Sequence, residues 1–323
     1  MILVTGGTGF VGAHTIVRLL AEGHPVRTTV RSLDREAEVR SIVADATGDG
    51  EISVVEADLT SDDGWARAVG GCEYVLHVAS PFPAREPSDP DAVIAPARDG
   101  ALRVLRAAHA AGVRRTVLTS SFAAIGYSAP PDGRPYDESD WTTPTDDLPA
   151  YIRSKTLAER AAWEFASESG HELVVINPTG IFGPALGPSL SASVGVVAAM
   201  LQGAMPTVPR ASFGVVDVRD VAVAHVRAMT APDAAGLRFL ATAASASDPF
   251  VGARLSYLGI AEILRERFPE FADRLPAAED PGPDVRPKEL GIARIRTVLG
   301  WNPRPAEDAV VATAERLLEQ GLT

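Results

Sequence analysis

The chain has a single cysteine, Cys72, in 323 residues. One cysteine excludes an intrachain disulfide and a cysteine-based zinc cluster, and its apolar surroundings favour a buried, unreactive thiol. The six histidines lack the short spacing that places two metal ligands on one helical face. The sequence therefore predicts no metal site.

Positive charge is also in short supply. Thirty basic residues stand against 42 acidic ones, which gives a net charge of -12. Such a chain repels phosphate backbones and anionic lipid, so we expect neither nucleic acid nor a membrane as a partner. The apolar start, residues 1–4, lacks the basic region of a signal peptide, and we expect a cytoplasmic protein.

Residues 173–209 contain no Asp, Glu, Lys or Arg. The segment is long enough to span a bilayer, but prolines and glycines recur through it and would break a spanning helix. We expect it to be buried in protein or to line a cavity.

Apolar runs and amphipathic stretches alternate through the first half of the chain. Short β-branched runs predict strands at 2–4, 26–30, 52–55, 74–79, 116–119 and 173–176. Helical apolar spacing predicts helices between them, at 13–20, 101–111 and 158–165. This alternation predicts an α/β fold, a doubly wound parallel sheet with helices on both faces. Two long connections, 81–96 and 127–149, are expected to be loops.

Glycines recur at Gly6, Gly9 and Gly12, directly after the first strand and before the first helix. In this setting the three permit a tight turn, close approach of a pyrophosphate, and packing of helix on strand. The helix N-terminus then offers free N–H groups to phosphates. A Rossmann-type dinucleotide site is the favoured interpretation, and a purely structural glycine turn is the alternative.

The end of the second strand bears on the choice of cofactor. An acidic residue there would bind a ribose 2′-hydroxyl, whereas this chain has Arg31, whose planar guanidinium suits a 2′-phosphate. We therefore predict NADP(H), with a solvated surface arginine as the alternative. Asp58, at the end of the third strand, is placed to meet the adenine amino group or simply to cap the following turn.

Tyr151 and Lys155 lie four residues apart on one face of the third helix. A free phenol has a pKa of about 10, and a neighbouring ammonium can lower it toward the working range of an acid-base catalyst. Ser120 and Ser121 end the preceding strand, where a hydroxyl can donate to a substrate carbonyl or only cap a turn.

Several strings of the chain together resemble the extended short-chain dehydrogenase/reductase family. They include TGGTGFVG at 5–12, HVASP at 77–81, YIRSKTLAE at 151–159, INPTGIFGP at 176–184 and LGWNPR at 299–304. The resemblance is to the branch of dihydroflavonol reductases, cinnamoyl-CoA reductases and microbial aldehyde/ketone reductases. It covers nearly the whole chain and thins between 241 and 297.

The resemblance implies residue roles. Tyr151 would be the general acid, Lys155 would hold the nicotinamide ribose and lower the phenol pKa, and Ser121 would bind the carbonyl. Positions matching cofactor contacts are Gly6, Gly9, Phe10, Val11, Gly12, Arg31, Asp58, Leu59, Val78, Lys155 and Pro178. The chain departs from many relatives in having only two asparagines, Asn177 and Asn302, neither at the position of the relay asparagine. The proton is therefore expected to reach Tyr151 through a ribose hydroxyl, Lys155 and water.

The predicted activity is NADPH-dependent reduction of a hydrophobic aldehyde or ketone, a small-molecule substrate, by a monomer or homodimer. The alternatives are an NAD-dependent nucleotide-sugar epimerase or dehydratase, and a non-catalytic NADPH-binding regulator. We expect 1–177, with 213–240 returning to it, to bind the dinucleotide, and 178–212 with 241–323 to form a smaller, mostly helical substrate domain. The predicted pocket residues, of which about half should prove to be core, are Phe82, Ile125, Tyr127, Phe182, Leu186, Met200, Met205 and Phe213.

Overall fold

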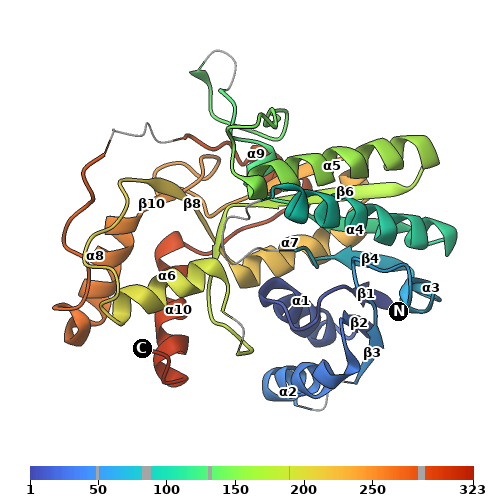
Figure 1. Cartoon of the computed structure of the whole chain (residues 1–323), viewed down its shortest axis with the longest axis horizontal. Coiled ribbons are helices and arrows are strands. Elements are labelled where there is room, and N and C mark those ends of the chain that lie inside the picture. The colour runs from blue at the N-terminus through green and yellow to red at the C-terminus, as the bar shows by residue number, and fades with distance from the viewer. Residues whose placement is uncertain (49–50, 82–88, 130–132, 189, 283–287) are drawn as a thin grey trace.

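A computed structural model describes residues 1–48, 51–81, 89–129, 133–188, 190–282 and 288–323. Within these ranges, seven parallel strands form the main sheet, in the order β3-β2-β1-β4-β5-β6-β9 (Figure 1). They are β1 (Ile2–Val4), β2 (Val26–Val30), β3 (Ile52–Glu56), β4 (Tyr74–His77), β5 (Arg115–Thr119), β6 (Glu172–Pro178) and β9 (Arg238–Ala241). The order reverses beside β1, which places a ligand crevice at the carboxyl ends of β1 and β4. The predicted doubly wound fold is confirmed.

The central strands are buried on both faces. Val4 of β1 pairs with Thr28 of β2 and with Leu76 of β4, and all three side chains are fully buried. Continuous apolar or β-branched runs, rather than alternating ones, are what a parallel sheet covered by helices requires.

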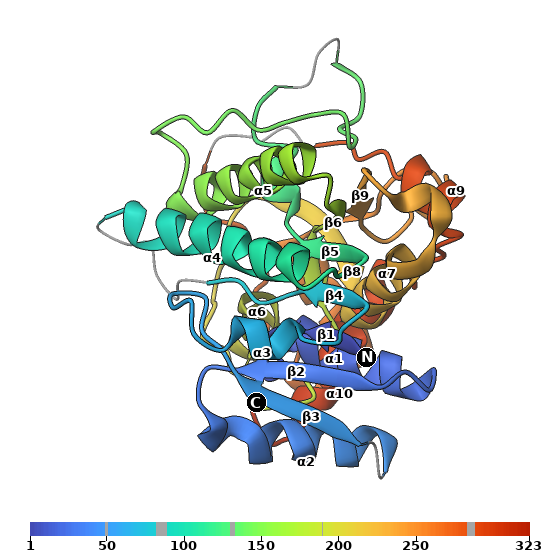
Figure 2. The same cartoon turned by 90° about the vertical axis from the view of Figure 1, so that its right-hand side faces the viewer.

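Helices cover the two faces of this sheet (Figure 2). One layer holds α3 (Trp65–Val69), α4 (Asp91–Ala110) and α5 (Ala150–Ser169), and the other holds α1 (Phe10–Ala21), α2 (Glu36–Thr47) and α7 (Val218–Thr230).

Residues 91–96 of the expected loop over 81–96 are helical instead, because α4 begins at Asp91. The N–H of Asp91 bonds the Asp89 carboxylate, and Pro96 lies inside the helix. The prolines and acids of this segment favoured a loop, whereas burial of Val93 and Ile94 stabilises the helix.

A second, smaller unit lies beside the carboxyl ends of the main sheet (Figure 1). Its three-stranded sheet has the order β10-β8-β7, formed by β7 (Gly180–Phe182), β8 (Ser212–Asp217) and β10 (Arg254–Ser256). The helices α6 (Ala192–Leu201), α8 (Tyr257–Arg267) and α10 (Ala306–Glu319) pack around it, while α9 (Ala293–Leu299) packs against α7 and β9.

The segment 213–240 is divided between the two sheets, so the expectation that it returns to the main sheet needs correction. β8 pairs with β7 and β10 in the small sheet, whereas α7 and β9 belong to the main one. The apolar residues of a short strand predict that it is buried, but they do not predict which strand it pairs with, because pairing depends on tertiary contacts.

The uncharged segment 173–209 forms β6, β7 and α6, whose apolar side chains lie in the two cores. Across the described ranges, every helix is too short or too polar to cross a membrane.

Candidate active site

The turn between β1 and α1 depends on its glycines. Gly6 has a φ of 74°, in the left-handed region that favours glycine. A Cβ at Gly12 would lie 2.2 Å from the carbonyl oxygen of Gly6, so only glycine allows the helix this close to the strand. Gly9 caps α1 without a side-chain acceptor, and the first turn, which begins Phe10-Val11, has no acidic residue. Its N–H groups therefore suit an anionic ligand such as a pyrophosphate.

Thr5 ties this turn to the loop that follows β4. Its hydroxyl oxygen accepts hydrogen bonds from the N–H groups of Val78 (3.0 Å) and Ala79 (2.9 Å). Its own proton is then donated to Nδ1 of His77, 2.9 Å away, so the proton of this imidazole lies on Nε2. Burial, together with the charge of Lys155, lowers the pKa of His77 to about 3. His77 is therefore a neutral structural residue.

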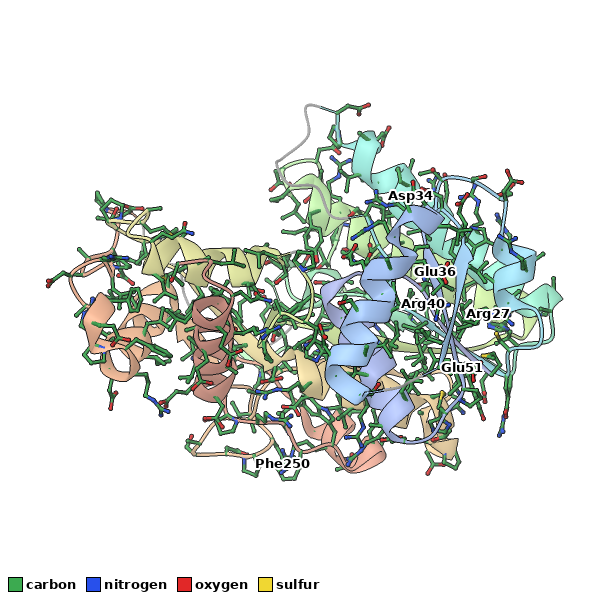
Figure 3. The ribbon with its side chains drawn as sticks, turned by 90° about the horizontal axis from the view of Figure 1, so that it is seen from below. Arg27, Asp34, Glu36, Arg40, Glu51 and Phe250 are labelled. Carbon is green, nitrogen blue, oxygen red and sulfur yellow. The ribbon has the colours of Figure 1, made fainter. Side chains whose placement is uncertain are left out.

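Arg31 is exposed and directly follows β2, three residues before Asp34. Asp34, labelled in Figure 3, lies in the turn that leads into α2. The guanidinium of Arg31 makes no hydrogen bond or ion pair with any described residue, whereas the nearby Arg35 is held by Glu38 in a bidentate pair. Arg31 is thus the arginine of this turn that can contact a ligand phosphate without first losing a partner.

One carboxylate oxygen of Asp58 is hydrogen-bonded within the protein. Its Oδ1 accepts from the N–H (2.7 Å) and hydroxyl (2.6 Å) of Thr60, and these bonds hold the carboxyl pKa below its usual range. The capping role that the sequence left open is therefore present. The second carboxylate oxygen has no bond to a described residue.

Tyr151 and Lys155 lie in the first turns of α5, at the crevice. The phenol of Tyr151 is hydrogen-bonded to the Ser121 side chain, and the Lys155 Nζ lies 5.9 Å from the phenol ring centroid. Lys155 Nζ donates to the Ser80 hydroxyl at 2.9 Å, and burial lowers its pKa to about 8 although Glu159 raises it. The structure thus brings the three predicted catalytic residues together.

The electrostatic balance at the phenol differs from the expected one. Burial raises the pKa of Tyr151 above its usual range, the bond from Ser121 opposes this, and Tyr127 adds to it. The net direction at the phenol is therefore opposite to the predicted lowering of its pKa. The polypeptide alone therefore holds Tyr151 as a protonated phenol, the form that a proton donor needs.

The two candidate serines have different surroundings. Ser120 is buried and donates to Oε2 of Glu159, while Ser121 lies at the crevice and also caps the short helix that begins at Phe122. The hydroxyl proton of Ser120 is therefore used in a buried hydrogen bond rather than at the crevice.

Glu159 is a functional-site residue that sequence reasoning missed. Its Oε2 accepts from Ser120 and from the Asn177 amide (2.7 Å), and its Oε1 accepts from Arg238 (2.5 Å). Asn177 also donates to the Ser121 carbonyl oxygen at 3.1 Å. The available signal was its position four residues after Lys155, on the same face of α5.

A small cavity of about 20 Å³ lies between Lys155, Glu159, Ser80, Ser120 and His77. A space of this size with polar walls can hold one water molecule. It lies beside Lys155, where the predicted water-mediated proton path requires one.

The predicted pocket residues fall into three groups. Ile125 and Met200 are fully buried in the two cores, and Phe182 is also buried, stacked at 6.1 Å on Phe213. Tyr127 is 42 % exposed, whereas Leu186, Met205 and Phe213 are half-buried. Phe82 lies outside the described residues. Ile125 and Met200 are thus core rather than pocket surface, since their side chains fill the interior between packed elements.

The remaining cofactor candidates surround the same crevice. Leu59 packs against Gly100 of α4, Val78 follows β4, and the buried Pro178 ends β6. Among the described residues, no group of three or more His, Cys, Asp or Glu is arranged to hold a metal.

Comparisons with known proteins define the family. Residues 2–239 match the model of the NAD dependent epimerase/dehydratase family, and the chain belongs to it. The chain is 33% identical over 329 residues to a cinnamoyl-CoA reductase of Medicago truncatula, covering 99% of this chain and 96% of that protein. The predicted resemblance to extended short-chain reductases is thereby confirmed.

Solved structures of other proteins have the same fold as this chain. Yeast methylglyoxal/isovaleraldehyde reductase Gre2, complexed with NADPH, superposes with a TM-score of 0.85 at 26% identity, covering 100% of this chain and 99% of that chain. The UDP-glucose 4-epimerase of Thermotoga maritima superposes at 0.76 with 22% identity over 99% of each chain, which shows a shared fold. A nicotinamide dinucleotide is thus the cofactor of the family.

The Glu159 network yields a stability prediction. Glu159→Ala leaves the guanidinium of Arg238 buried without its carboxylate, which should cost about 3–5 kcal/mol of unfolding free energy. The matched control is Glu164→Ala, an exposed glutamate on the same helix, which should change stability by less than about 0.5 kcal/mol. Urea denaturation measures both, and equal effects of the two substitutions would contradict the role assigned to Glu159.

Proposed function

We propose that the protein is an NADPH-dependent reductase that converts a hydrophobic aldehyde or ketone to an alcohol. The observation that carries the proposal is the hydrogen bond between Ser121 and Tyr151 beside the buried Lys155, at the crevice that faces the glycine turn. The likeness to reductases over almost the whole chain supports it.

The residues of the crevice fit the dinucleotide. The α1 N-terminus would hold the pyrophosphate, Arg31 the 2′-phosphate, and the second oxygen of Asp58 the adenine amino group. Lys155 would hold the nicotinamide ribose, with Leu59, Val78 and Pro178 as apolar walls. When bound, NADPH supplies the hydride for the carbonyl carbon.

The chain's own groups supply the proton. The Ser121 hydroxyl orients the substrate by donating to the carbonyl oxygen, and the phenol of Tyr151 gives its proton to the same oxygen as negative charge develops there. Lys155 stabilises the resulting phenolate and, with a water in the adjacent cavity, returns a proton to it. No asparagine side chain is needed in this path.

Cofactor choice tests the role of Arg31. Arg31→Asp should raise the KM for NADPH roughly ten- to hundredfold and lower that for NADH, because a charge-assisted phosphate contact of about 1.5–3 kcal/mol is lost. Arg40→Asp is the control, since Arg40 is exposed on α2 and is paired with Glu36 (Figure 3). Equal use of both cofactors by the wild type would contradict the assignment.

Tyr151→Phe tests the mechanism. The ring is kept, so NADPH binding followed by fluorescence should change little, while kcat for reduction should fall by at least about 10²–10⁴-fold. Lys155→Met should weaken both binding and turnover. If Tyr151→Phe kept more than about a tenth of kcat, another group would be the donor and the non-catalytic NADPH-binding interpretation would regain support.

A substrate panel tests the pocket. Phe182 and Phe213 stack beside Tyr257, which meets Phe213 edge-on at 5.1 Å, and form an apolar wall. Aromatic aldehydes and bulky ketones should therefore exceed small charged oxo acids in kcat/KM, measured as NADPH oxidation. A clear preference for a nucleotide sugar would instead favour an epimerase or dehydratase.

A further inference from the structure

Lys288 is an unusual residue in this chain. Only two of the 30 basic residues are lysines, Lys155 and Lys288. The first is the lysine of the catalytic group. The second lies beside the loop that follows Ser121, and neither the sequence motifs nor the proposed chemistry accounts for it.

The ammonium of Lys288 rests on aromatic rings. Its Nζ lies 3.7 Å from the ring centroid of Tyr127, 5.9 Å from that of Phe122 and 6.0 Å from that of Tyr136. Within the described ranges, no carboxylate oxygen lies within 4.0 Å of it. This half-buried cation therefore has π faces as neighbours but no counterion among the residues that the structure describes.

The backbone around Lys288 is fixed by other bonds. The N–H of Tyr136 donates to the Glu289 carbonyl oxygen at 2.9 Å, and the N–H of Gly291 donates to the Tyr136 carbonyl oxygen at 2.8 Å. Arg254 of β10 donates to the Lys288 carbonyl oxygen at 3.1 Å. The ammonium is therefore not required to hold this segment in place.

The same position adjoins the catalytic phenol. Tyr127 adds to the raised pKa of Tyr151, and Tyr257 adds to that of Tyr127, so the three phenols lie within electrostatic reach of one another. The hydroxyls of Tyr127 and Tyr257 make no hydrogen bond with a described residue. Two free phenol donors and one ammonium thus lie at the edge of the wall formed by Phe213.

We propose that Lys288, with the hydroxyls of Tyr127 and Tyr257, binds a carboxylate carried by the carbonyl substrate. The inference rests on the proposed reductase function and deepens it: the substrate is an aromatic or otherwise apolar aldehyde or ketone with an acidic group distant from the carbonyl. The apolar body lies against Phe213, and the carboxylate supplies a counterion to Lys288, which has none among the described residues.

The physical reason is the local balance of charge. A cation partly removed from water gains more from an anionic partner than an exposed one does. The groups next to it are the phenols of Tyr127 and Tyr136 and the guanidinium of Arg254, and Tyr257 lies near Tyr127. Burial raises the pKa values of all three phenols. These phenols therefore stay neutral around pH 8, so Lys288 is the group of this cluster whose charge changes there.

The test compares 4-formylbenzoate with its methyl ester, which has the same ring and aldehyde but no charge. In the wild type at pH 7 the acid should have the higher kcat/KM. Lys288→Met should lower kcat/KM for the acid roughly ten- to hundredfold, as expected for one charge-assisted bond, and change that for the ester less than about threefold. Lys288→Arg should keep part of the preference, because it keeps the charge.

The pH dependence adds a second readout. Burial lowers the pKa of Lys288 to about 8, so the acid-to-ester ratio of kcat/KM should fall as pH rises through 8 in the wild type. In Lys288→Met the ratio should be flat. Loss of the Lys155 ammonium over the same range affects both substrates and cancels in the ratio.

The outcomes separate the two proposals. If neither compound is reduced at any pH while other aldehydes and ketones also fail, the reductase function is wrong. If both compounds are reduced and the ratio is the same in wild type and Lys288→Met, the carboxylate site is wrong while the reductase stands. Retained turnover of the ester by Lys288→Met shows that this variant is folded.

Discussion

The buried carboxylate of Glu159 is the constraint on which the active-site loops depend. A charge removed from water needs partners, and this one has hydrogen bonds from Ser120, Asn177, Trp163 and Arg238. These partners come from the end of β5, from β6, from α5 itself and from β9. One carboxylate therefore fixes the helix that carries Tyr151 and Lys155 relative to the strand that ends in the catalytic serine.

Arg238 extends this constraint to the loop above the sheet. Its guanidinium donates to the carbonyl oxygens of Glu138 and Asp140 and lies 3.7 Å from the centroid of the Trp141 ring. Residues 138–141 of the long connection between β5 and α5 are thereby held against the main sheet. Tyr136 lies in this connection, and through its bonds to Glu289 and Gly291 the C-terminal segment with Lys288 is placed as well. A few buried polar contacts thus position the loops that surround the crevice of this fold.

The smaller unit is tied to the main sheet by a second set of buried acids. Asp217 caps α7 and pairs with Arg219. Asp220 accepts hydrogen bonds from the N–H and the guanidinium of Arg304, so its buried charge has a partner. Trp301 donates to the carbonyl oxygen of Asp220 at 2.9 Å. β8 leads directly into α7, so these contacts also fix Phe213 relative to the dinucleotide crevice.

The features that depend only on neighbouring residues could be predicted from the sequence. They are the strands at 26–30 and 173–176, the glycine turn, and the i, i+4 pair of Tyr151 and Lys155. Burial, turn geometry and helical spacing each depend on residues close together in the chain. Neighbouring residues left Ser120 and Ser121 equal, and the choice of Ser121 came from the family resemblance. The pairing of β8 with β7 and β10 and the partners of Glu159 could not be predicted, since each depends on residues brought together from distant segments. Lys288 was missed for the same reason: its rings belong to the loop after Ser121, far from it along the chain.

The distribution of charge in the folded chain shows why net charge and site chemistry must be considered separately. A net charge of -12 argues against partners that present extended anionic surfaces, because such partners interact with the averaged field. That field is screened within about 10 Å, whereas a small ligand in a crevice experiences the nearest groups. Those groups include Arg31 at the end of β2, Lys155 at the centre and Lys288 on its aromatic rings, none of which has a carboxylate within ion-pair distance among the described residues. The acidic exterior thus coexists with a crevice that carries these three cations beside the carboxylate of Asp58, and a small anion there interacts mainly with the cation nearest to it.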